Sequence, residues 1–133
     1  MNIQQVFDTV LSHLWQQNAS AVVEEGSDCC YFDELTGNKC AIGCLIPSEY
    51  YSSDMEGHGI VGVLELFPNL REIPAIRAIA EHPAPNCEFG WYLQSLHDNL
   101  ALVHPDDFRT YLRSAANALA DRYGLTVNLP TEE

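Results

Sequence analysis

The chain has 133 residues, 47% of them hydrophobic, which predicts one globular domain over residues 1–133 and argues against intrinsic disorder. Its 19 acidic and 6 basic residues give a net charge of −13, which argues against direct binding to nucleic acid because phosphate contacts need lysine and arginine. The sequence contains no apolar run of about 18 residues, and its N-terminus lacks the basic and apolar regions of a signal peptide. We therefore expect a cytoplasmic protein without a membrane span.

Apolar residues at helical spacing predict helices at residues 3–14, 60–67, 74–80, 89–103 and 105–123. Asn2 stands at the N-cap position of the first helix, and Gln5 follows three residues later, as in a capping box. Gly124 follows the last helix as a C-terminal cap. The tail at residues 127–133 is expected to fray.

Residues 29–42 have the composition of a small β-hairpin. Strand formers at 29–32 and turn residues at 33–38 precede a second short segment at 39–42 that could pair back. The predicted fold class is α+β, predominantly helical, with this hairpin packed on about four to five helices. Residues 40–46 also fit a short helix with two cysteines on one face, and both interpretations stay open.

The acidic residues are unevenly distributed. Residues 1–70 hold ten acids and one base, whereas residues 71–133 hold nine acids and five arginines. The one base, Lys39, is expected to act as a local counter-ion for Asp33 or Glu34. A field of this sign speeds encounter with a basic protein partner, but a large net charge also serves solubility alone.

Five cysteines in a chain without a signal peptide indicate free thiols or metal ligands. A structural zinc ion needs four ligands in a tetrahedron, usually supplied as close pairs. The candidate zinc ligands are Cys30, Cys40, Cys44 and His58. Cys40 and Cys44 have apolar neighbours, so burial as small hydrophobic side chains is the favoured interpretation, and no cofactor is expected.

A catalytic thiol is a further alternative. Cys40 or Cys44 could pair with His58 or with His97, which Asp98 follows directly. A cysteine nucleophile needs a base within hydrogen-bond distance and surroundings that lower its pKa. The sequence has no recognisable nucleophile motif, and His97 is expected on a partly exposed flank of its helix.

Acidic and aromatic side chains are the candidates for partner recognition, since tyrosine and tryptophan are common interface anchors. The candidates are Glu24, Glu25, Asp28, Tyr50, Tyr51 and Trp91. Trp91 is expected to face sideways from its helix, because Tyr92 lies on the apolar stripe. Packing inside the protein is the alternative for the aromatic residues.

The pattern G-x-K-C-A-x-G-x-L-I-P-x-x-x-Y occupies residues 37–51, with an aromatic residue before it and E-G at residues 56–57. This pattern, together with A-x-R-Y-G-L at 120–125, resembles a family of small uncharacterised proteins from tailed phages, prophages and some bacteria. The resemblance implies a protein that acts inside an infected bacterial cell. The family has no established activity, so it identifies no catalytic residues. Position 44 need not be cysteine in the family, and Ser48 stands where an acidic residue is usual.

The leading hypothesis is a non-enzymatic acidic protein that binds a host protein with a basic surface and blocks it sterically and electrostatically. A nucleic-acid-handling protein or a defence factor is the expected type of target. A zinc-stabilised module and a thiol-dependent enzyme are the alternatives. A homo-oligomer through the last two helices is left open.

Overall fold

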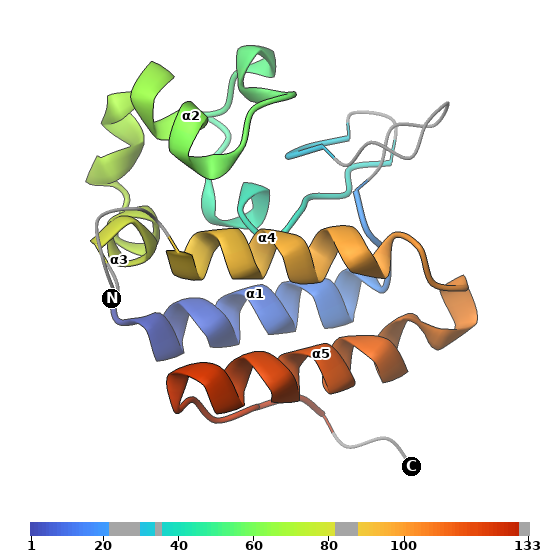
Figure 1. Cartoon of the computed structure of the whole chain (residues 1–133). Helices are drawn as coiled ribbons and strands as arrows, with labels where there is room; N and C mark the ends of the chain where they lie inside the picture. Colours follow the sequence, from blue (N-terminus) through green and yellow to red (C-terminus); the bar gives the residue numbers. More distant parts are fainter. Residues whose placement is uncertain (22–29, 34–35, 82–87, 131–133) are drawn as a thin grey trace.

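The computed structural model describes residues 1–21, 30–33, 36–81 and 88–130. Helices dominate this part of the chain (Figure 1). In chain order they are α1 (Ile3–Gln17), η1 (Gly43–Leu45), η2 (Ser53–Met55), α2 (Ile60–Leu66), η3 (Pro68–Glu72), α3 (Pro74–Glu81), α4 (Glu88–Leu100), η4 (Pro105–Asp107) and α5 (Phe108–Tyr123), where η marks a short 3-10 helix. The predicted helices are confirmed, except that the last one divides into η4 and α5.

Helix α1 has the start that its sequence predicts. The Asn2 side chain accepts the N–H of Gln5, and the Gln5 side chain accepts the N–H of Asn2, both at 2.9 Å. The capping box is therefore confirmed. The helix ends at Gln17, and the capping residue Asn18 makes the last helical bond, from its N–H to the carbonyl of Leu14. Its left-handed conformation (φ 54°) then turns the chain away from the helix.

Helix α5 packs against both α1 and α4 and runs in the opposite direction to them, while α3 also contacts both (Figure 1). Gly124 caps α5 with φ 68°, as predicted. Burial of large apolar side chains holds these helices together, at about 1.5–3 kcal/mol for each. The largest fully buried side chains include Phe7, Leu11, Leu14, Ile76, Ile79, Phe89, Leu93 and Leu112.

The predicted β-hairpin is absent from the described residues, so the α+β assignment is wrong. An isolated antiparallel bridge joins Phe32 to Lys39, and the described ranges contain no sheet. After the bridge the chain turns: the N–H of Cys44 donates to the carbonyl of Cys40 at 3.0 Å, and η1 follows directly. The helical alternative for residues 40–46 is therefore closer to the structure.

The pairing stops after two backbone bonds, from the N–H of Asp33 to Asn38 and from the N–H of Cys40 to Tyr31. The groups that would extend it bind elsewhere, because the Cys40 carbonyl accepts the N–H of Cys44 and the Tyr31 N–H donates to a side chain. The N–H groups of Tyr31 and Phe32 donate to the carboxylate of Glu56 at 2.9 and 3.2 Å. The N–H of Lys39 donates to Gln17 Oε1 at 2.8 Å, and its carbonyl accepts Gln17 Nε2 at 2.9 Å. Side chains distant in the sequence thus bind the outer backbone groups of Phe32 and Lys39, where a further strand would otherwise pair.

The tail also differs from its prediction. Gln4 binds both backbone groups of Thr126, each at 2.9 Å, and so ties the chain after α5 to α1. Alternate side chains of this extended segment pack against the core: Leu125, Val127 and Leu129. The expectation of fraying is wrong for residues 127–130, and residues 131–133 lie outside the described ranges.

Candidate functional site

A small recess opens between the residues that follow the Phe32–Lys39 bridge and those that precede η2. Its volume is about 100 Å³. Its lining is largely apolar, but it also includes the hydroxyl-bearing side chain of Ser48 and the cationic side chain of Lys39. The lining residues are Phe32, Lys39, Gly43, Ile46, Ser48 and Tyr51, and we call this site the Phe32 recess.

The Glu56 carboxylate positions both aromatic walls of the recess. Besides the N–H groups of Tyr31 and Phe32, it accepts the hydroxyl of Tyr51 at 2.6 Å. The rings of Phe32 and Tyr51 then meet edge to face, with centroids 5.6 Å apart. Three donors on one carboxylate fix this geometry, since hydrogen bonds to charged groups are the stronger kind.

Gly43 forms part of the recess lining because no larger residue fits there. A Cβ atom at this position would lie 2.0 Å from the carbonyl oxygen of Tyr31. The N–H of Gly43 donates to Cys40 Sγ at 3.1 Å, so the same residue also contacts the buried thiol. The glycine thus allows the two chain segments of the recess to approach closely.

Lys39 is fixed at its backbone, and its side chain lines the recess with the ammonium over the Phe32 ring. Its carbonyl accepts His13 Nε2 at 3.1 Å in addition to the Gln17 bond. Its ammonium lies 5.9 Å from the centroid of Phe32 and outside ion-pair distance of any described carboxylate, Asp33 included. The counter-ion expectation for Asp33 is not met, and Glu34 lies outside the described residues.

The candidate zinc ligands differ in burial. Cys30 and Cys40 are buried and Cys44 is half-buried, whereas the imidazole of His58 is exposed. Across the described ranges, no three His, Cys, Asp or Glu side chains are arranged to hold a metal ion. Burial, which was the favoured interpretation, is therefore confirmed for Cys40, whereas Cys44 is only half-buried.

Burial also controls the acidity of these thiols. It raises the pKa of Cys40 far above its usual range and that of Cys44 to about 12. Burial, together with the nearby charge of Glu56, raises the pKa of Cys30 to about 11. Because the thiolate is the nucleophile and the metal ligand, these three side chains stay protonated and weakly reactive near neutral pH.

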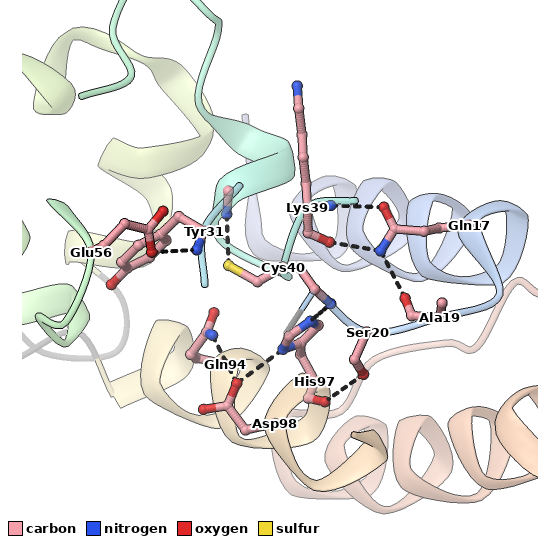
Figure 2. Close-up of polar contacts among 12 residues, drawn as sticks. Gln17, Ala19, Ser20, Tyr31, Lys39, Cys40, Glu56, Gln94, His97 and Asp98 are labelled. Atoms are coloured by element: carbon pink, nitrogen blue, oxygen red, sulfur yellow. Dashed lines mark hydrogen bonds and ion pairs between the residues drawn. The ribbon is translucent and has the colours of Figure 1, made fainter. Parts of the chain in front are cut away.

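His97 is fully buried, so the expectation of a partly exposed flank is wrong. Its Nε2 accepts the N–H of Ala21 at 2.9 Å, which leaves the proton on Nδ1 to be donated to Asp98 at 2.9 Å (Figure 2). Gln94 donates to the same Asp98 oxygen, and Ser20 donates to the carbonyl of His97. With its Nε2 lone pair engaged, His97 joins the chain after α1 to α4 and is not free to act as a base.

The partner-recognition candidates fall into three groups. Glu24, Glu25 and Asp28 lie outside the described residues. Tyr50 and Tyr51 are half-buried and pack against the core. Trp91 is 59% exposed, and its ring meets that of Tyr92 edge to face at 5.0 Å, so it remains accessible on the surface of α4.

Four of the six basic residues place their charged group over an aromatic ring. Arg109 and Arg113 both lie over Trp15, and Arg122 lies 4.4 Å from the centroid of Tyr92. Lys39 over Phe32 is the fourth. Most of the cationic side chains thus make cation–π contacts within the protein, while acidic side chains remain on the surface.

Sequence reasoning missed the two residues that organise the site, Glu56 and Gln17. Neither belongs to an apolar stripe or a cysteine–histidine cluster. Glu56 belongs to the E-G dipeptide of the resemblance and to an acidic loop, and neither feature indicated the partners that it binds. Gln17 carried no signal, because a surface glutamine of a helix has no predictable distant partner.

No protein-family model, no curated protein and no solved structure matches this chain. Within the described residues, no helix has both the length and the apolar character needed to cross a membrane. The resemblance based on residues 37–51 therefore remains a prediction.

Proposed function

We propose that this protein binds a partner protein with a basic surface and blocks that surface sterically and electrostatically, without catalysing a reaction itself. The setting that we propose, from the resemblance, is the cytoplasm of a bacterial cell infected by a phage. The observation that carries the proposal is the acidic exterior: a net charge of −13 with most basic side chains packed over rings.

Five exposed acids between residues 49 and 81 supply the proposed contact surface. They extend from the segment after η1 to the end of α3 and comprise Glu49, Asp54, Glu65, Glu72 and Glu81. Negative charge over several neighbouring elements attracts a basic groove at long range and raises the association rate. The partner's specificity then depends on shape at close range.

The chemistry of the interior supports a binding role over the thiol-enzyme alternative. The raised thiol pKa values leave little thiolate at neutral pH. The imidazole of His97 is committed to Ala21 and Asp98. The thiols therefore contribute to packing, and the imidazole of His97 contributes hydrogen bonds.

The test is capture of partners from a bacterial lysate on the immobilised protein, followed by titration of each purified partner by calorimetry. Affinity should fall steeply between roughly 50 and 300 mM salt, as the Debye length decreases from about 14 to 6 Å. Absent binding, or binding that salt leaves unchanged, contradicts the proposal.

A matched pair of charge reversals locates the surface. Glu65→Lys on α2 should weaken binding about fivefold to tenfold, since it places a positive charge in the proposed contact surface. Asp121→Lys on α5 is equally exposed and changes the net charge by the same amount. Equal effects of the two variants would show that net charge, and not this surface, determines binding.

A further inference from the structure

We propose that the Phe32 recess binds a small organic acid with one branched apolar group and one carboxylate. The apolar group enters the recess beside the contacting rings of Phe32 and Tyr51, and the carboxylate pairs with the ammonium of Lys39. This site is separate from the surface acids of the proposed function, and it requires no protein partner.

The walls of the recess determine the apolar part of the ligand. Phe32, Tyr51 and Ile46 supply two ring surfaces and an aliphatic side chain, and Gly43 leaves space because it has no side chain. A cavity of about 150 Å³ accepts benzene, so a recess of about 100 Å³ accepts a branched group of about four or five carbons. Apolar walls with few polar groups are typical of small-molecule sites.

The charged group among the lining residues determines the polar part of the ligand. Lys39 is the base of residues 1–70, and the Gln17 and His13 bonds to its backbone fix the point from which its side chain extends. Its ammonium rests 5.9 Å from the Phe32 centroid and is outside ion-pair distance of the described carboxylates. A ligand carboxylate beside the ring therefore gains both a charge partner and hydrogen-bond donors.

Two sources of negative charge could repel a ligand carboxylate at the recess: the distant surface acids and the carboxylate of Glu56. Both act more weakly than the net charge of the protein suggests. Surface acids more than about 8 Å away are largely screened at physiological salt. Glu56, which binds the lining residues Phe32 and Tyr51, already accepts three hydrogen bonds. The ammonium of Lys39 is the charged group that the lining residues of the recess offer to a ligand.

The test uses 4-methylpentanoate as the probe and 4-methylpentanamide as its neutral match. Amide chemical shifts of the full-length protein are followed by NMR up to about 20 mM probe, because ligands of this size bind with dissociation constants near 1 mM. The carboxylate should shift the amides of Gly43 and Ser48 and bind at least about threefold more tightly than the amide. No shift at these positions, or equal binding of the two probes, overturns the proposal.

Three variants assign the two parts of the ligand. Lys39→Met keeps the apolar stem and should weaken 4-methylpentanoate about threefold to tenfold, whereas Arg71→Met removes an exposed charge elsewhere and should leave affinity unchanged. Ser48→Phe fills the exposed opening and should abolish binding. Equal effects of the Lys39 and Arg71 variants, or binding that survives Ser48→Phe, would refute the assigned geometry.

A branched apolar group next to a carboxylate also occurs at the C-terminus of a polypeptide whose last residue is leucine. Acetyl-glycyl-leucine and its C-terminal amide distinguish this source. Tighter binding of the dipeptide acid than of 4-methylpentanoate identifies a chain terminus as the ligand. Weaker binding supports the free acid, and the absence of binding by both acids overturns the site.

Discussion

Glu56 is the side chain on which the geometry of the recess depends most. Its two oxygens accept hydrogen bonds from Tyr31, Phe32 and Tyr51. The substitution Glu56→Gln replaces one of these oxygens with an NH₂ group, which cannot accept the hydrogen bonds that the oxygen accepted. The free energy of unfolding should therefore fall by about 1.5–3 kcal/mol. Urea denaturation measures this change.

Glu49→Gln is the matched control for this substitution, because Glu49 is exposed in the same region. It should change the free energy of unfolding by at most about 0.5 kcal/mol. If the two variants were equally stable, the Glu56 hydrogen bonds would not be needed to hold the two segments together.

His13 makes the stability depend on pH. Burial, the largest cause, lowers its pKa below the usual 6.5, while its bond to the Lys39 carbonyl opposes the shift. Below about pH 6.5 the unfolded chain takes up a proton that the folded protein does not, so stability falls as pH decreases towards the folded pKa. Above pH 6.5 this contribution is constant.

His13→Gln removes this group and tests the sign. The loss of stability between about pH 7.5 and 5.5 should be smaller in the variant than in the parent protein. Urea midpoints at both pH values measure the difference. A larger loss in the variant would mean that His13 is stabilised in its protonated form.

At the scale of elements, two glutamines of α1 act as substitute strand partners. Gln4 binds the N–H and carbonyl of Thr126, and Gln17 binds the same two groups of Lys39. Each carboxamide reproduces the donor and acceptor that a neighbouring strand would offer. Helix α1 thus fixes the tail at one end and the recess at the other.

Gln4→Ala should free the tail without unfolding the protein. The amide of Thr126 loses its acceptor, so its hydrogen exchange should accelerate at least about fivefold, while amides within α5 should be unchanged. Gln16→Ala, an exposed change on the same helix, is the control. Unchanged exchange at Thr126 would show that apolar packing alone holds the tail.

The helices were predictable because each carries its own signal. The stripe of α1, its capping box and the glycine after α5 are local features of the sequence. The hairpin and the tail were not predicted correctly, because their backbone partners are side chains of Glu56, Gln17 and Gln4. Burial of His97 was missed for the same reason, since its acceptor role depends on Ala21, 76 residues away.

For the candidate site, the sequence indicated the segment but not the arrangement. The pattern at residues 37–51 contains most of the recess lining. The approach of Phe32 to Tyr51 depends on Glu56, which no periodicity indicates. The zinc and thiol hypotheses were based on residue type and spacing, whereas burial determines how acidic those thiols are.

At the scale of the whole molecule, the folded protein carries a net charge of −13, and most of its cations pack over rings. Repulsion among the surface acids opposes the compact state and is screened by salt. The free energy of unfolding should therefore rise when sodium chloride increases from about 10 to 300 mM.

Thermal or urea unfolding at several salt concentrations tests this expectation. Near pH 4.5, the isoelectric point of the sequence, the net charge vanishes and the salt effect should be smaller. A fall in stability with salt at neutral pH would instead indicate that attractive ion pairs outweigh repulsion.

The N–H of Cys30 donates to the carbonyl of Ala21 at 3.0 Å, so these two residues lie side by side. His97 Nε2 accepts the N–H of the same Ala21 and ties this junction to α4. Doubling the length of the connecting stretch costs only about 0.6 kcal/mol of closure entropy. This junction is thus a natural position at which to insert an affinity tag or a fluorescent reporter.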